Sequence, residues 1–341
     1  MSVIGVLIRG TTTGAAHIRL SRSKATRRAA FLMLVACLVS TAVHAAVPST
    51  ERAVLDALYA STNGAGWTVS TGWEGAAGTE CSWVGITCDP AGDHIVGIDL
   101  FSDHLVGALP DLSGLPQLQS VVVDANALAG SLPSLAALSQ LQTFTASSNN
   151  LTGSLPSLSG LSHLQYLDVA GNQISGPIPP LSGLSQLIAF SADGNRLTGS
   201  IPPLAGLANL VFLRVGGNLL TGPMPSLAGL TSLTTVDISN NSLSGPVAAS
   251  PTPSALAASS SSLCPNALIP AATPETATDS AWDAATGLTP WSTGCTGSVV
   301  PPSSRTAVSA PALSWWSIVA LIAALIYFGM HVRRTFHDRE E

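Results

Sequence analysis

Lysine is almost missing from this sequence of 341 residues, and charged residues of any kind are scarce. Lys24 is the single lysine, and Asp, Glu, Lys and Arg together make up only 9% of the chain. Between Asp93 and Val247, eight aspartates face two arginines, which gives this region a net charge of −6. Nucleic-acid binding requires clustered cations, so this composition excludes nucleic acid as a partner.

Motifs for catalysis and for metal binding are also lacking. No nucleophile elbow, phosphate-binding glycine loop or HExxH motif occurs in the sequence. His94, His104 and His163 are spread along the chain without the spacing of metal ligands, and a zinc site would need four ligands close together. A calcium or glycosidase site built from the scattered aspartates is a minor alternative. We therefore expect a protein that is not an enzyme, with no catalytic residue, metal or cofactor.

A repeat with a fixed period of 23 dominates what the sequence does contain. Seven glycines recur at this spacing, and an Asp or Asn stands four residues before each: Gly107, Gly130, Gly153, Gly176, Gly199, Gly222 and Gly245. Around each asparagine the pattern is L-x-x-L-x-L-x-x-N-x-L. The alternation across Leu167 and Val169 predicts a strand. Self-similarity at a fixed period indicates a solenoid, in which each copy buries its apolar face against its neighbours.

The asparagine of each copy follows the predicted strand, where the chain turns. A short amide pointing inward can satisfy the backbone groups that the turn leaves unpaired. We expect a ladder of such amides, one in each coil after the Asp103 position: Asn126, Asn149, Asn172, Asn195, Asn218 and Asn241.

The pattern followed by "SGPIP", "TGSIP" or "TGSLP" resembles the plant-type extracellular leucine-rich repeat. The resemblance implies a leucine-rich-repeat solenoid over residues 93–247, with a parallel β-sheet on the concave face and an irregular or short-helical convex face. The stretch "ECSWVGITCD", with Trp83 between two cysteines, is similar to the N-terminal cap of such proteins. This similarity implies a helical, disulfide-bonded cap at residues 46–92. Its helix is expected to begin at Ser49 or Thr50 and to end at Asn63-Gly64.

The first 45 residues read as a signal peptide. They are basic, contain no acidic residue and end in an apolar run with an A-x-A-like site near Ala45. A transit peptide is the alternative, since such leaders are also rich in Arg and Ser. Cys37 leaves with the leader, and the four remaining cysteines are an even number in a secreted chain. They predict two disulfides, Cys81–Cys88 and Cys264–Cys295.

The repeat pattern stops after Val247. We interpret residues 248–263 as a low-complexity linker, 264–296 as a disulfide-closed C-terminal module and 297–311 as a stalk. Residues 312–330 carry no charge and match the length of a transmembrane helix, with basic residues after it. The sequence therefore predicts a type I single-pass protein of the plasma membrane. Its cytoplasmic tail, residues 331–341, is too short to be a kinase.

The outward positions of the predicted strands hold the candidate binding residues. Tyr166 and Phe212 lie two strands apart with Ala189 between them, an arrangement typical of a binding hot spot. The neighbouring polar candidates are Asp168, Asp193, Arg214 and Asp237. A merely solvated acidic surface is the alternative interpretation of these carboxylates.

The layout resembles a receptor-like protein without a kinase. It implies recognition or adhesion through an extracellular protein, peptide or glycan ligand, with a co-receptor for any signalling. The layout is also similar to the leucine-rich-repeat surface antigens of kinetoplastid protists, and a structural coat without a specific ligand is the alternative function. Asn150 and Asn240 stand in N-x-S/T sequences and are the expected glycosylation sites.

Overall fold

The computed structural model describes residues 47–251, 255–270, 277–293 and 295. The predicted signal peptide, stalk, transmembrane helix and cytoplasmic tail lie outside these residues. Within the described part of the chain, no helix is long and apolar enough to cross a membrane.

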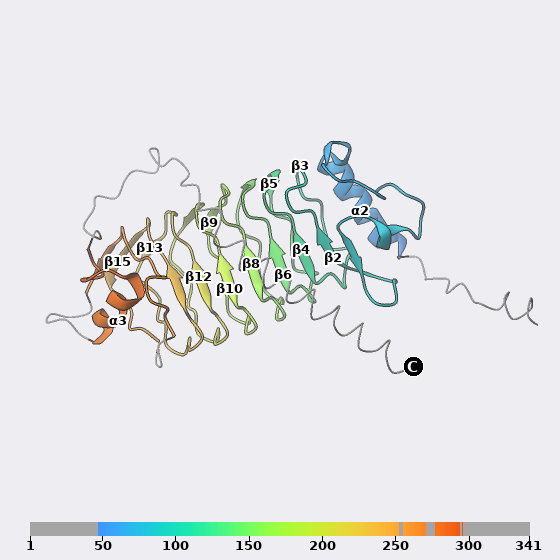
Figure 1. The fold of residues 1–341 in the computed structure, drawn as a ribbon. Helices are drawn as coiled ribbons and strands as arrows, with labels where there is room; N and C mark the ends of the chain where they lie inside the picture. The colour runs from blue at the N-terminus through green and yellow to red at the C-terminus, as the bar shows by residue number, and fades with distance from the viewer. Residues whose placement is uncertain (1–46, 252–254, 271–276, 294, 296–341) are drawn as a thin grey trace, which may run out of the picture. The chain divides into compact units, whose positions relative to one another are not determined.

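One sheet of eight short strands runs through the repeats, in the order β1-β2-β4-β6-β8-β10-β12-β14 (Figure 1). The strands are β1 (Ile86–Cys88), β2 (Ile95–Asp99), β4 (Ser120–Val122), β6 (Thr143–Thr145), β8 (Tyr166–Asp168), β10 (Ala189–Ser191), β12 (Phe212–Arg214) and β14 (Thr235–Asp237). Successive coils pair in parallel exactly one repeat apart, so that Leu167, Phe190 and Leu213 are neighbours across three strands. Only β1, which belongs to the cap, pairs antiparallel to its neighbour. The predicted parallel sheet is thereby confirmed.

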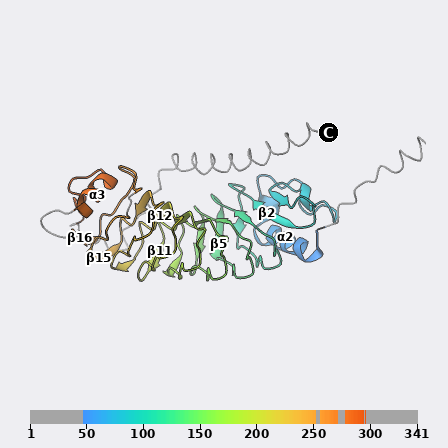
Figure 2. The same ribbon diagram turned by 90° about the horizontal axis from the view of Figure 1, so that it is seen from below.

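The return side of each coil is made of turns and very short strands. These strands are β3 (Val106–Gly107), β5 (Ala127–Ser131), β7 (Asn150–Thr152), β9 (Ser175–Pro177), β11 (Arg196–Thr198), β13 (Thr221–Gly222) and β15 (Ser242–Pro246); they lie apart from the eight-stranded sheet (Figure 2). No helix occurs between Leu100 and Val247, so the short-helical alternative for this side is wrong. The repeated glycine and proline explain this result, because both residues interrupt helices.

The asparagine ladder holds the coils together. The Oδ1 atom of Asn172 accepts a hydrogen bond from the N–H of Leu151 in the preceding coil, at 2.9 Å. Its Nδ2 atom donates to the carbonyls of Val169 and Ala170 in its own coil and to that of Ala146 in the coil before. The same pattern recurs at Asn149, Asn195, Asn218 and Asn241. Each amide therefore satisfies backbone groups of two coils at once.

The glycine recurs in each repeat because its backbone has a positive φ angle. Gly176 has a φ of 77°, in the left-handed region that favours glycine. A Cβ atom on Gly153, whose φ is 75°, would lie 3.0 Å from the Cβ of Ser131 in the preceding coil. The turn after each ladder residue thus needs a residue without a side chain.

Behind the sheet, the leucines of all coils form one continuous core. In the coil of Asn172, Leu161, Leu164, Leu167, Val169 and Ile174 are all at most 2% exposed. Each such side chain contributes about 1.5–3 kcal/mol relative to an exposed one. Because every coil packs on its neighbours, this core has to be closed at both ends.

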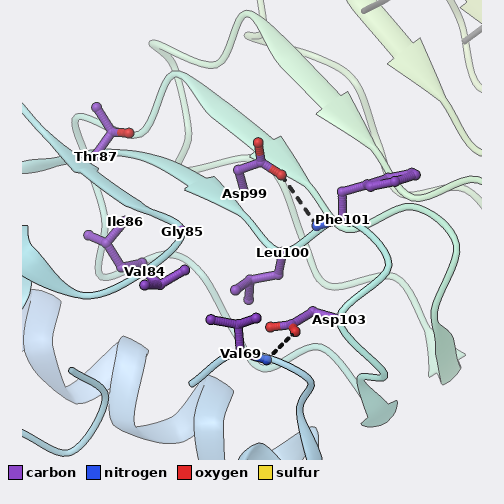
Figure 3. A pocket seen from close by; sticks show the side chains of 9 residues that line it. All are labelled: Val69, Val84, Gly85, Ile86, Thr87, Asp99, Leu100, Phe101 and Asp103. Carbon is purple, nitrogen blue, oxygen red and sulfur yellow. Dashed lines mark hydrogen bonds between the residues drawn. The ribbon is translucent and has the colours of Figure 1, made fainter. Parts of the chain in front are cut away.

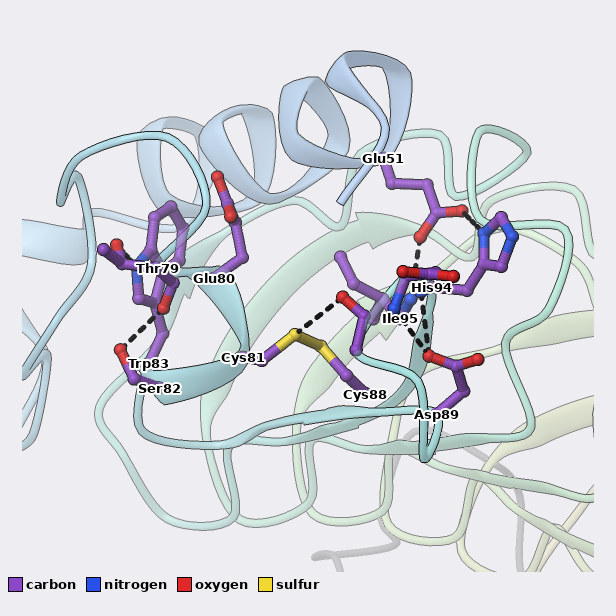
Figure 4. Close-up of a disulfide and its surroundings, with 12 residues drawn as sticks. Glu51, Thr79, Glu80, Cys81, Ser82, Trp83, Cys88, Asp89, His94 and Ile95 are labelled. Carbon is purple, nitrogen blue, oxygen red and sulfur yellow. Dashed lines mark hydrogen bonds and ion pairs between the residues drawn. A yellow bond between two sulfur atoms is a disulfide. The ribbon is translucent and has the colours of Figure 1, made fainter. Parts of the chain in front are cut away.

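The cap closes the N-terminal end with helix α2 (Ser49–Ser61) and a cluster of aromatic rings. Trp73 packs against both Trp67 and Trp83, with ring centroids 4.7 and 5.1 Å apart. The helix begins at Ser49, as predicted, but no side chain caps it. The predicted disulfide Cys81–Cys88 is present, and Cys81 lies in a short 3-10 turn, Glu80–Ser82 (Figure 4). Another 3-10 turn, Gly64–Gly66, follows α2.

Buried charges tie the cap to the first coil. Glu51 of α2 is only 1% exposed, and its Oε2 atom accepts a hydrogen bond from the N–H of Ile95 at the start of β2. Its Oε1 atom lies 2.6 Å from Nδ1 of His94 (Figure 4). Arg52 pairs with the buried Glu80. His94, which lacked the spacing of a metal ligand, is therefore half of an ion pair that joins two elements.

The C-terminal end differs from the prediction, since the solenoid continues past Val247. Residues 255–263 do not form a free linker: the N–H of Ser262 donates to Val236, and β16 (Ala267–Ile269) pairs in parallel with β15. Asn266 adds a further ladder residue, because its Oδ1 accepts from the N–H of Leu243. The spacing from Asn241 to Asn266 is longer than the regular period, which concealed this coil.

Helix α3 (Ala277–Thr286) follows this last coil. Trp282 and Trp291 are fully buried, and the indole N–H of Trp282 donates to the carbonyl of Ala248. The predicted Cys264–Cys295 disulfide is present. The C-terminal module therefore packs on the solenoid and closes its core.

The ladder leads to a first prediction. We expect Asn172→Ala to lower the free energy of unfolding by about 1–3 kcal/mol, because buried backbone groups of two coils lose their partner. Ser182→Ala, at an exposed position of the next coil, should change it by less than about 0.5 kcal/mol. Urea unfolding of both variants measures the difference, and equal midpoints would contradict the role of the ladder.

The ion pair between cap and coil leads to a prediction on pH. The hydrogen bond to Glu51, and the negative charge of this carboxylate, raise the pKa of His94 above its usual value. Its contribution to stability is complete below the unfolded pKa of about 6.5 and is lost as the pH rises through the higher folded pKa. We expect wild type to lose stability relative to His94→Gln as the pH rises above about 6.5, as measured by urea midpoints. Ser182→Ala, at an exposed position without a titratable group, should keep the same difference from wild type at every pH.

Candidate ligand-binding face

The outward side chains of the eight-stranded sheet form three rows, which we call the sheet face. The first row contains the predicted aromatic pair. Tyr166 and Phe212 are half-buried, and both are registered with Ala189, which lies on the strand between them. Ala189 itself is only 3% exposed. Ala189 is therefore too buried to offer a contact surface, and this part of the prediction is wrong. Its methyl group lies between two larger neighbours, the rings of Tyr166 and Phe212.

The second row carries most of the charge. Asp168, Ser191, Arg214 and Asp237 follow one another on adjacent strands. Ser191 is buried, whereas the three charged residues are half-buried. The Oδ1 atom of Asp168 accepts a hydrogen bond from the N–H of Ala170 at 2.9 Å, which fixes its carboxyl group.

The third row lies at the ends of the strands and is less exposed than the sequence suggested. Asp124 is 2% exposed and accepts hydrogen bonds from the hydroxyl of Thr145 and from both the N–H and the hydroxyl of Ser147. Ser147, although it stands at an outward position of the repeat pattern, is therefore buried and structural. Lateral bonds between neighbouring coils explain this difference, since a single copy of the repeat does not contain them.

The carboxyl groups of the sheet face have perturbed acidities. Desolvation, reinforced by the negative charges of Asp124 and Asp193, raises the pKa of Asp168 to about 7. Desolvation also raises the pKa of Asp124 and of Asp193. The positive charge of Arg214 works in the opposite direction and favours the ionised form of Asp193. The face therefore holds one carboxyl group whose charge changes near neutral pH.

An open cleft of about 410 Å³ lies at the N-terminal end of the sheet, between the cap and the first coil (Figure 3). Val69 and Val84 of the cap line it together with Asp99, Leu100 and Asp103 of the first coil. The sequence did not indicate this cleft, because its two walls come from separate segments of the chain. Among the residues that the structure describes, no cluster of three or more His, Cys, Asp or Glu could hold a metal ion.

Residues 139–183 match the family model described as "Leucine Rich repeats (2 copies)". This chain is a leucine-rich-repeat protein.

Solved structures with similar repeats include ectodomains of plant receptors. The plant peptide hormone receptor RGFR1, in complex with RGF2, is 35% identical over 44% of this chain and 25% of its own, with a TM-score of 0.42. The ectodomain of the Arabidopsis receptor kinase HAESA, with an IDA peptide hormone, is 28% identical over 58% and 38%, with a TM-score of 0.44. A chain of the BIR3–SERK2 complex from Arabidopsis thaliana is 30% identical over 49% and 94%, with a TM-score of 0.40. This chain spans between 25% and 38% of the length of the RGFR1, GASSHO1 and HAESA chains.

In this leucine-rich-repeat protein, two ladder asparagines stand next to exposed ones. Asn149 and Asn241 are buried, whereas their neighbours Asn150 and Asn240 are exposed. Of these four residues, Asn150 and Asn240 alone are open to the solvent, so glycosylation at these two residues stays a prediction that is compatible with the geometry.

The acidity of Asp168 leads to a further prediction. Its raised pKa means that the folded state favours the neutral carboxyl, so stability is lost as the pH rises from about 4 to about 7. We expect Asp168→Asn to unfold at a higher urea concentration than wild type at pH 8 but not at pH 4. The control is Asp111→Asn, because hydrogen bonds from Ser113 lower the pKa of Asp111. This variant should not gain stability at pH 8, and a gain equal to that of Asp168→Asn would contradict the assignment.

Proposed function

We propose that this leucine-rich-repeat protein is a non-catalytic recognition protein. It binds an extracellular protein, peptide or glycan ligand through the sheet face, at the patch formed by Tyr166, Phe212, Asp168 and Arg214. In this proposal residues 312–330 anchor the chain in the plasma membrane, and a co-receptor carries any signal inward. Asp193 and Asp237 complete the patch as its acidic border.

The pair of half-buried aromatic rings is the observation that carries this proposal. Tyr166 and Phe212 stand on either side of the strand of Ala189, in the central part of the sheet. Because half-buried aromatic rings have few free rotamers, they lose little side-chain entropy on binding and still bury a large area. Tyr and Arg are also enriched among the residues that dominate binding energies, and Arg214 belongs to the same strand as Phe212, β12.

The charge of residues 47–295 restricts the ligand further. Residues 47–295 contain sixteen carboxylates and three arginines. A surface of this sign favours a ligand with positive charge, because complementary potentials accelerate association and disfavour like-charged partners. The proposed ligand is therefore basic where it meets the sheet face.

A binding screen with the full chain displayed on cells tests the proposal. For a ligand found in this way, we expect Tyr166→Ala and Phe212→Ala each to weaken binding by about 2 kcal/mol or more, that is about 30-fold. Ser182→Ala, on the return side, should leave the affinity unchanged. An unchanged affinity of the double aromatic variant would reject the patch and favour a structural surface coat.

A further inference from the structure

The cleft between the cap and the first coil has an apolar centre. Val69, Val84 and Leu100 form it, and the carboxyl groups of Asp99 and Asp103 lie on opposite sides of Leu100 (Figure 3). Leu100 belongs to the core and is 2% exposed, but Val69 and Val84 are 43% and 42% exposed. The volume of about 410 Å³ falls within the range of ligand pockets, roughly 300–1,000 Å³.

Exposed apolar side chains gather at this cleft rather than being scattered. Six large hydrophobic residues are exposed in the part of the chain that the structure describes, and three of them line the cleft: Val69, Val84 and Phe101. Single exposed apolar residues are normal, whereas a group of them marks an interaction site.

The capping role of the N-terminal segment does not explain this exposure. Capping is performed by Trp83 and Ile86, which are 2% and 8% exposed and belong to the core. Val84 lies between them in the chain, with its N–H donated to the carbonyl of Thr71 and its side chain turned into the cleft. The backbone of this valine is thus hydrogen-bonded within the cap, while its side chain is exposed and does not belong to the buried core.

Two carboxyl groups give the cleft its polarity. Asp103 is 7% exposed, and its Oδ1 atom accepts a hydrogen bond from the N–H of Val69, which connects the two walls. Asp99 is exposed, and its Oδ1 atom accepts from the N–H of Phe101. None of the residues that line the cleft is cationic. An apolar centre with acidic borders fits an apolar side chain that has a basic neighbour.

We propose that this cleft is an anchor site for a peptide or protein segment in which an aliphatic side chain stands next to an arginine or lysine. The aliphatic side chain packs on Val69, Val84 and Leu100, and the cation lies against Asp99. The anchor site deepens the proposed function, on which it rests, by naming the chemistry that the ligand presents at the N-terminal end of the sheet.

A second copy of this chain is a poor occupant of the cleft. Of the three arginines in the described region, Arg52 already pairs with Glu80 and lies over the ring of Trp83. The sixteen carboxylates in residues 47–295 of one copy would repel those of the other. The charge balance therefore favours a foreign, basic segment.

Binding of short labelled peptides to the detergent-solubilised full chain tests this proposal by fluorescence anisotropy. The main probe is a hexapeptide of glycine and serine with one leucine followed by one arginine, and the matched probes carry leucine–glutamate or alanine–arginine instead. We expect saturable binding of the main probe and at least about fivefold weaker binding of either matched probe. No saturable binding of the main probe, or equal binding of all three, would overturn the proposal.

Two pairs of variants locate the site. Val84→Thr and Asp99→Asn should each weaken binding of the main probe by about fivefold or more. Their matched controls outside the cleft, Val106→Thr and Asp111→Asn, should leave it unchanged; Val106 is 51% exposed. Equal effects of test and control variants would overturn the anchor site.

Variants of the sheet face distinguish a failure of the anchor site from a failure of the proposed function. If Tyr166→Ala and Phe212→Ala abolish binding of the main probe while Val84→Thr does not, the anchor site is wrong but the proposed function stands. If Tyr166→Ala, Phe212→Ala, Val84→Thr and Asp99→Asn all leave binding of the main probe unchanged, the anchor site is wrong. The screen with displayed chains then decides the proposed function independently.

Discussion

The whole structure depends on a buried amide that bonds to two coils. Each ladder asparagine reaches the carbonyls of its own turn and, through Oδ1 and Nδ2, an N–H and a carbonyl of the coil before it. The amide converts a turn, whose backbone groups would be unpaired, into the contact that fixes the position of the next strand. Once this spacing is set, the leucines align into one core and the outward residues align into rows. The sheet face is therefore a consequence of the ladder, although none of its residues belongs to the ladder.

Because the ladder and the core maintain the fold, other positions of each repeat are available for function. The ladder residue, the glycine that follows it in each repeat and the leucines are constrained by burial or by φ angle. The first and second rows of the sheet face are less restricted, since the first row holds residues as different as Gly97, Tyr166, Ala189 and Phe212. The third row is intermediate, since Asp124 and Ser147 bond to each other across coils. At the half-buried positions of the first two rows, a binding surface can therefore change with less effect on the fold than a change of a ladder residue would have.

Contacts within one period could be predicted from the sequence, and contacts between distant segments could not. The strand, the inward asparagine and the glycine turn follow from alternation and spacing alone. The burial of Ser147, the ion pair of His94 with Glu51 and the cleft lined by Val69 all join residues from different coils or from the cap. Asn266 is a different case: "LCPNAL" contains the pattern L-x-x-N-x-L, but its distance from the preceding ladder residue exceeds the period. The search for a fixed period missed a coil that the hydrogen bonds reveal.

The fixed reach of the ladder has a consequence for how such a chain can change its length. The amide of Asn172 bonds to residues 21 and 26 positions earlier, and Asn195 and Asn218 repeat these offsets. Loss or gain of whole repeat units would join equivalent positions and keep every amide opposite its partners. The last coil is longer, and Asn266 bonds instead to residues 23 and 28 positions earlier. Genetic recombination between whole repeats can therefore shorten or extend the protein, and an event beside the coils of Tyr166 and Phe212 would bring new side chains next to them while the interior stays the same.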